Sequence, residues 1–157
     1  CVMVCRALAS KRVHALPRGY SLHRVGAHVF AQAVGQLRGS PLAQRQAHAQ
    51  RMERSPVPFD AFVVKSDADG AVAACAQGAV EGQLVGLYDV ITNPEHRSKG
   101  LAASLCEHIL MNSKQDATVQ SGYLQVEAHN HAARRIYTRL GFADAFQYHY
   151  RWLPNVG

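Results

Sequence analysis

The fold of this chain is decided by one stretch, Asn93-Pro94-Glu95-His96-Arg97-Ser98-Lys99-Gly100-Leu101-Ala102. An apolar run over residues 83–92 predicts a strand that stops at the proline, and the apolar spacing that starts at Leu101 predicts an amphipathic helix. The first N–H groups of a helix have no partner inside it and can bind an anion. Gly100 lets a ligand approach the backbone closely, and Arg97 and Lys99 add positive charge. This junction therefore suits a pyrophosphate.

The same junction has a plainer interpretation, which is a strand–turn–helix connection with a solvated basic rim. It lacks the G-x-x-x-x-G-K-[ST] spacing of a P-loop and the G-x-G-x-x-G spacing of a dinucleotide fold. Taken alone, the junction does not distinguish an anion site from a simple connection.

A second segment repeats the order strand, turn, helix. Residues 123–128 alternate as a short strand, with Leu124 and Val126 on one face. A turn containing Asn130 follows, and the next apolar residues fall at helical spacing up to Leu140. Gly141 then ends the helix at the position where a left-handed residue is favoured.

With both segments in place, the sequence resembles the GNAT family of N-acetyltransferases. Arg97-x-x-Gly100-x-Ala102 is similar to the family's (Gln/Arg)-x-x-Gly-x-(Gly/Ala) acetyl-CoA signature, and the series Asn130…Ala133…Tyr137…Leu140-Gly141-Phe142 is similar to its second motif. Either half is a weak pattern alone; both together, in order and correctly spaced, are a strong one. The resemblance covers about residues 83–153, whereas residues 1–58 resemble no family that we would name.

The resemblance implies that acetyl-CoA is the co-substrate and assigns residues to it. The backbone N–H groups that would hold the pyrophosphate are those of Arg97, Ser98, Lys99, Gly100, Leu101 and Ala102. The strand end that would pair with the pantetheine consists of Val90, Ile91 and Thr92, and the second motif adds Asn130 and Ala133 to the cofactor site.

The resemblance also implies that Tyr137 protonates the departing thiolate. A phenol can do this because it keeps its proton at neutral pH. The alternative role of Tyr137 is core packing, since it shares an apolar helix face with Ile136 and Leu140.

A base must take a proton from the attacking amine. The candidates are Asp89 and Glu127, two carboxylates within otherwise apolar strands. For each, a strand-edge carboxylate facing water is at least as good an interpretation, and water can carry the proton instead. Tyr88, Tyr148 and His149 are candidates to line the acceptor pocket on position alone.

The rest of the chain is expected to complete one domain over residues 1–157. The expected strands are residues 1–8, 59–65, 71–79, 83–92, 123–128 and 146–153, and the expected helices are 21–37, 41–54, 101–114 and 132–140. The fold class is therefore α/β (α+β), with a GNAT-like mixed, mainly antiparallel twisted sheet flanked by helices in the order β-α-α-β-β-β-α-β-α-β. Because one type of family member fuses two such domains, the chain is also compatible with the second half of a tandem protein.

Composition bounds the function. The 157 residues carry a formal net charge of +6, but the basic residues are dispersed and do not alternate with aromatic ones, which argues against specific nucleic-acid binding. No apolar run is long enough for a membrane span, and a cytoplasmic protein is expected. The four cysteines are expected to be reduced, and the nine histidines to bind no metal.

Two functions remain in view. The first is an N-acetyltransferase whose acceptor is a small amine, a peptide N-terminus or a lysine, and a homodimer is compatible with it. The second is a GNAT-like regulatory module that binds acetyl-CoA without turnover.

Overall fold

The structure, a computed structural model, describes residues 1–8 and 14–146 as seven strands, four α-helices and one 3-10 helix. The strands are β1 (Val2–Cys5), β2 (Tyr20–Val25), β3 (Phe59–Ser66), β4 (Val72–Glu81), β5 (Leu84–Thr92), β6 (Ser121–Gln125) and β7 (Ala143–Phe146). The helices are α1 (Ala27–Arg38), α2 (Leu42–Glu53), α3 (Leu101–Ser113) and α4 (His131–Arg139), with η1 (Pro94–His96) before α3.

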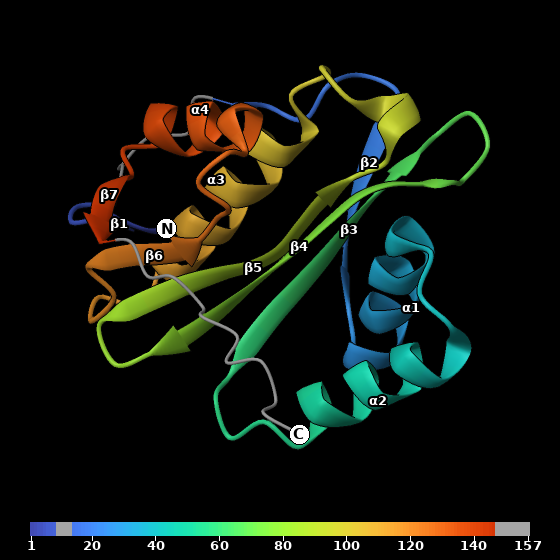
Figure 1. The fold of residues 1–157 in the computed structure, drawn as a ribbon, viewed down its shortest axis with the longest axis horizontal. Helices are drawn as coiled ribbons and strands as arrows, with labels where there is room; N and C mark the ends of the chain where they lie inside the picture. Colours follow the sequence, from blue (N-terminus) through green and yellow to red (C-terminus); the bar gives the residue numbers. More distant parts are fainter. Residues whose placement is uncertain (9–13, 147–157) are drawn as a thin grey trace, which may run out of the picture.

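All seven strands join one sheet in the order β2-β3-β4-β5-β6-β1-β7. Every neighbouring pair is antiparallel except β5 and β6, which run parallel where residues 84–87 pair with residues 121–124. Figure 1 shows that β6 lies beside only one end of the long strand β5. The other end of β5 is therefore left without this neighbour, and the sheet opens there.

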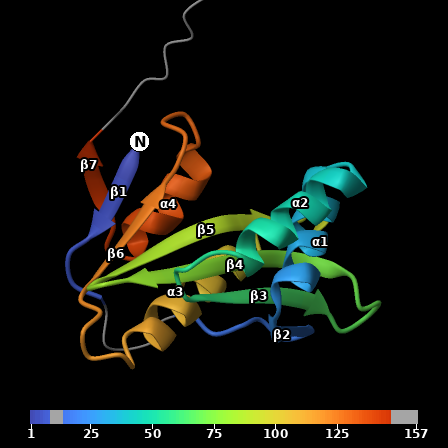
Figure 2. The same ribbon diagram turned by 90° about the horizontal axis from the view of Figure 1, so that it is seen from below.

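The helices cover the two faces of the sheet. Figures 1 and 2 show α1 and α2 on one face and α3 on the other, with α4 packed against α3. Each face has its own apolar core, one centred on Phe30 and Val63, the other on Leu105, Ile109 and their neighbours. No helix in the described part of the chain has the length and apolar character needed to cross a membrane.

The structure confirms the predicted mixed, mainly antiparallel sheet with helices on both faces. The meander β3-β4-β5 is present and stops at Asn93. The polar helix α2 lies on the surface as expected, and only Ala49 and Met52 in it are buried.

The prediction of one helix over residues 21–37 was wrong in its first part, because Tyr20–Val25 is strand β2 and only Ala27–Arg38 is helical. Leu22 and Val25 fit a helical face by spacing, but they belong to a strand whose backbone pairs with β3 along its whole length. The observed order is therefore β-β-α-α-β-β-β-α-β-α-β. Strand pairing here outweighs an ambiguous local pattern.

The short strands near the ends of the chain also differ from the prediction. β1 covers Val2–Cys5 rather than residues 1–8, and β6 covers Ser121–Gln125 rather than 123–128. β7 at Ala143–Phe146 shares only Phe146 with the strand predicted over 146–153. The rest of the predicted strand, with Tyr148 and His149, lies outside the described residues.

The fold shields the thiols of Cys75 and Cys106 from solvent. All four cysteines, which fall within the described ranges, are free thiols, and Cys75 and Cys106 are fully buried. Burial raises the pKa of each of these two thiols to about 12, and for Cys75 the nearby Asp89 carboxylate adds to the rise.

We therefore expect Cys75 and Cys106 not to react with a disulfide reagent at pH 8, because both thiols are shielded and protonated at that pH. Counting reacted thiols in native and urea-unfolded protein measures this, and all four should react after unfolding. A Cys75→Ser/Cys106→Ser variant should give the same native count as the unchanged protein. A lower native count for that variant would contradict the expectation.

Candidate active site

The backbone at the start of α3 has the geometry of an anion-binding site. Gly100 is the N-cap residue with φ 78°, and Ser98 also has a positive φ of 61°, so the loop turns sharply into the helix. Within this fully described helix, the hydrogen bond from Ser104 N–H to the Gly100 carbonyl closes the first turn at 3.0 Å. The N–H groups of Leu101, Ala102 and Ala103 therefore have no partner inside α3.

The end of β5 faces this helix start. A β-bulge interrupts the β4–β5 register between Cys75 and Gln77, and the bulged residue Asp89 has φ 49°. The pairing of β5 with β6 stops at Leu87, before the bulge. The segment from Val90 to Thr92 thus continues past β6 with one backbone edge beside the opening of the sheet.

The third part of the site is α4. Asn130 is its N-cap residue, and the Asn130 Oδ1 atom accepts a hydrogen bond from Ala133 N–H at 3.1 Å. On the inner face of α4, Tyr137 is only 7% exposed and stacks edge-on against Phe142, with ring centroids 6.2 Å apart. The cap and this aromatic contact fix the direction of the helix and of the phenol.

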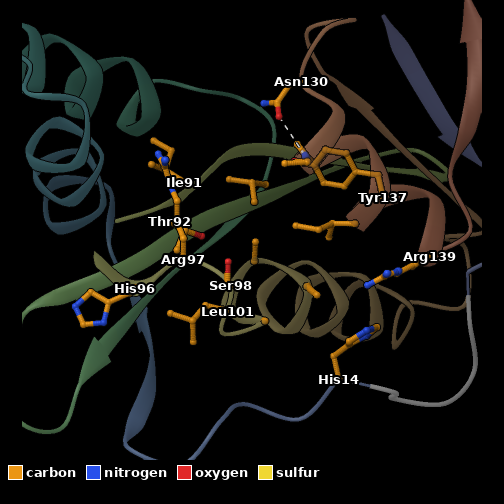
Figure 3. Close-up of a pocket in the computed structure, with 17 residues that line it drawn as sticks. His14, Ile91, Thr92, His96, Arg97, Ser98, Leu101, Asn130, Tyr137 and Arg139 are labelled. Carbon is orange, nitrogen blue, oxygen red and sulfur yellow. Dashed lines mark hydrogen bonds between the residues drawn. The ribbon is translucent and has the colours of Figure 1, made fainter. Parts of the chain in front are cut away.

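These three parts enclose a cavity of about 700 Å³, whose lining side chains are drawn in Figure 3. Ten of the eleven residues expected to bind the cofactor line it, together with Tyr137. The exception is Lys99, whose ammonium group donates a hydrogen bond to the Tyr20 hydroxyl at 2.8 Å and lies over the Tyr20 ring. One site therefore gathers side chains from both sequence motifs and from the end of β5.

The charge of this cavity is positive. None of its described lining residues is acidic, whereas Arg97 and Arg139 bring guanidinium groups, and His14 and His96 bring imidazoles. Figure 3 shows Arg139 reaching in from α4 opposite His14. A cavity with these two guanidinium groups and the start of α3 suits a ligand with several negative charges.

Burial also acts on the phenol of Tyr137. Removal from water, followed by the nearby Cys106 thiol, raises the pKa of Tyr137 above its ordinary value near 10. A raised pKa means that the proton stays on the oxygen at every pH at which the protein would normally work. Tyr137 thus lines the cavity with its hydroxyl protonated, and it is also part of the apolar core.

Asp89 lies outside this cavity, and its carboxylate points to the α1–α2 side. Its Oδ1 atom accepts a hydrogen bond from the Arg38 guanidinium at 2.8 Å, and its Oδ2 atom accepts one from the Gln77 amide at 3.3 Å. The His48 Nε2 atom lies 3.5 Å from Oδ2. The side chain is 16% exposed, so this carboxylate is not the water-facing strand-edge group that was the alternative interpretation.

Glu127 is placed differently. It follows β6 rather than lying in it, its side chain is 74% exposed, and it lies 3.1 Å from His129. It does not line the cavity, so the water-facing interpretation describes its position well. Among the described residues, no group of three His, Cys, Asp or Glu side chains could hold a metal ion.

Sequence reasoning missed part of the cavity wall. His14 comes from a segment more than 75 residues before the first motif, and nothing local to it indicates a site. Arg139 did carry a signal, because it lies two residues after Tyr137 in the last turn of α4. Tyr88, proposed for the acceptor pocket, lies in a second cavity with Tyr123.

Comparison with known proteins agrees with this geometry. Residues 31–142 match the sequence model of the acetyltransferase (GNAT) family. A curated relative, the uncharacterized N-acetyltransferase YobR of Bacillus subtilis (strain 168), is 24% identical over 148 residues, which are 94% of this chain and 59% of YobR. The chain thus spans less than two thirds of that relative.

Solved structures share the fold at low identity. A tandem GNAT protein from the clavulanic acid biosynthesis pathway superposes with a TM-score of 0.76 at 21% identity, over 90% of this chain and 48% of that one. The structure of AAC(6')-Iy in complex with a bisubstrate analogue, CoA-S-monomethyl-acetylneamine, gives a TM-score of 0.63 at 17% identity, over 85% of this chain and 99% of that one.

Proposed function

The chain belongs to the GNAT family of acetyltransferases, and from that membership we propose that it transfers an acetyl group from acetyl-CoA to an amine by direct attack. The observation that carries the proposal is the cavity that joins the start of α3, the end of β5 and Tyr137. One part of the cavity offers N–H groups that can bind the phosphates of acetyl-CoA. Another part offers a protonated phenol that can donate a proton to the leaving sulfur.

The cofactor residues act through their backbone and their charge. The N–H groups at the start of α3 bind the pyrophosphate, and the guanidinium group of Arg97 adds charge beside them. The exposed backbone edge of Val90 to Thr92 pairs with the amide groups of the pantetheine, and Asn130 and Ala133 border the same arm. This arrangement brings the thioester to the opening between β5 and β6.

The chemistry then needs one proton delivered and one removed. The amine attacks the thioester carbonyl, the carbon–sulfur bond breaks, and the Tyr137 hydroxyl protonates the sulfur. For the proton that the amine loses, Asp89 is better placed than Glu127, because it is partly buried at the bulge of β5. Its carboxylate forms an ion pair with Arg38, and water can connect it to the amine.

We propose that the protein is cytoplasmic and acts on a small-molecule or peptide amine. We propose residues 1–157 as one GNAT domain; membership of a tandem protein stays a prediction that the mass of the native product tests. A homodimer likewise stays a prediction.

Thiol release tests the proposed activity. Purified protein is incubated with acetyl-CoA and a panel of small amines and lysine peptides, and free CoA and the acetylated amine are measured together. Turnover with stoichiometric acetyl-amine supports the enzyme. Tight binding of acetyl-CoA with no product for any amine would contradict it and favour the regulatory module.

Replacing Arg139 tests whether its positive charge contributes to the binding of acetyl-CoA. We expect Arg139→Met to raise the Kd for acetyl-CoA by about three- to tenfold, because one charge-assisted contact to a phosphate is lost. Arg135→Met is the matched control, since Arg135 is an exposed arginine of the same helix that does not line the cavity. Equal effects of the two substitutions would contradict this role.

A further inference from the structure

A second cavity, of about 230 Å³, lies on the α2 side of the sheet. Met52 of α2 and Phe59 of β3 form apolar parts of its wall, and two tyrosines, Tyr88 and Tyr123, form an aromatic part. The tyrosine hydroxyls are hydrogen-bonded to each other, and the rings meet edge to face with centroids 6.0 Å apart. The cavity is thus lined mainly by apolar and aromatic surface.

The aromatic wall of the second cavity depends on a glycine in the sheet. Gly86 is opposite Tyr123 in the β5–β6 register, and Tyr88 follows Gly86 by two residues on the same strand. A Cβ atom at Gly86 would lie 2.6 Å from the Tyr88 ring and 2.8 Å from the Tyr123 ring. The absence of a side chain at Gly86 is therefore what allows both rings to lie over the strand.

The bulge decides which cavity each side chain of β5 faces. In a regular strand Tyr88 and Val90 would share a face, but the extra residue Asp89 turns Val90 to the opposite one. Tyr88 accordingly lines the second cavity and Val90 the main cavity. At about 3.4 Å per residue, these two positions are about 7 Å apart along β5. Tyr88, the β5 residue among the described lining of the second cavity, therefore lies two residues before the segment that would bind the pantetheine.

The polar groups of the second cavity are arranged along β4. Gln77 is opposite Tyr88 and lies at the end near the opening, and Glu81 is opposite Leu84 at the far end. Glu81 follows Gln77 by four positions, which is about 14 Å along the strand. Among the described lining residues, Glu81 is the only charged one.

From this arrangement we propose that the second cavity binds the acceptor, and that the acceptor is an elongated amine with an apolar middle and a second positive charge. The reacting nitrogen lies beside Tyr88 and Gln77, the apolar chain crosses the tyrosine faces, and the distal cation pairs with Glu81. Tyrosine faces and a carboxylate both favour a cation. The proposal rests on the proposed function and names the class of its substrate.

Three amines of equal length test it: 1,7-diaminoheptane, heptylamine and 7-aminoheptanoate. An extended chain of this length spans about 9 Å, which covers the separation once the reach of the Glu81 side chain is added. Each amine is titrated into protein saturated with CoA, so that binding is measured without turnover. We expect the diamine to bind about three- to tenfold more tightly than heptylamine, and the aminoheptanoate to bind least.

Two variants and a control identify the contacts. Glu81→Gln should remove the advantage of the diamine and leave heptylamine unchanged, whereas Gly86→Ala should weaken both amines by displacing the tyrosines. Glu53→Gln is the matched control, because Glu53 is an exposed acid next to Met52 in sequence that does not line the cavity. The Kd for acetyl-CoA should be the same in all three variants.

Equal binding of the three amines, no binding at all, or a diamine preference that survives Glu81→Gln would overturn the proposal. Its failure is separable from that of the proposed function. Acetylation of amines without regard to the distal charge would refute only the substrate class. Selective diamine binding without any acetylated product would refute only the enzymatic activity.

Discussion

Replacing Tyr137 by phenylalanine is expected to lower kcat by about 10²- to 10⁴-fold, the range found when a general acid is removed. The phenol is 7% exposed, lines the cavity and keeps its proton because burial raises its pKa. Phenylalanine fills almost the same space, so the Kd for acetyl-CoA and the melting temperature should change little. Steady-state kinetics and calorimetric titration of the same preparations measure both quantities.

The pH profile of kcat is a second test of the role of Tyr137. A raised pKa means that Tyr137 loses its proton at a higher pH than an ordinary tyrosine, whose pKa is about 10. Deprotonation of Tyr137 should therefore cause no fall in kcat below about pH 10. Unchanged turnover in Tyr137→Phe would contradict the catalytic role and leave core packing as the function of this residue.

Replacing Phe142 by alanine is expected to lower the free energy of unfolding by about 3–5 kcal/mol. Phe142 is 2% exposed, stacks against Tyr137, and fills the space beside Gly122, where its ring would lie 3.1 Å from an added Cβ atom. Alanine would leave a cavity between α4 and the sheet, and the direction of Tyr137 would lose one support. Urea unfolding followed by circular dichroism measures the loss.

Phe146→Ala is the matched control for this substitution. Phe146 is 60% exposed in β7, only four residues further along the chain, so its removal should change the free energy of unfolding by less than about 0.5 kcal/mol. Similar losses in the two variants would show that Phe142 does not hold α4 in place.

The parts of the fold that the sequence predicted well are local. Arg97 to Ala102 and Asn130 to Phe142 each belong to one strand–turn–helix unit, β5–α3 and β6–α4. Caps, glycines and apolar spacing specify such units within a few residues. The cavity follows from these two units, since the sheet places both helix starts beside the end of β5. Most of the proposed cofactor residues could therefore be found before the structure was known.

The parts that sequence reasoning missed depend on distant partners. Tyr20–Val25 became a strand because β3 pairs with it, and its own pattern also fitted a helix. His14 lines the cavity from a segment with no local signal. The surroundings of Asp89 depend on Arg38, which lies 51 residues earlier, and on a β-bulge that the apolar periodicity of the sequence does not reveal. Such contacts arise only when the whole chain packs.

Isothermal titration measures whether the start of α3 and the end of β5 form an acetyl-CoA site. Acetyl-CoA is titrated into the unchanged protein, into Ala102→Asp and into Asn112→Asp. Ala102→Asp puts a negative charge at the helix start, and Asn112→Asp puts the same charge near the other end of α3.

We expect a micromolar Kd for the unchanged protein and for Asn112→Asp, and a Kd at least about tenfold higher for Ala102→Asp. No binding by folded, unchanged protein, or equal affinities for the two charged variants, would contradict the claim and leave the loop as a structural connection.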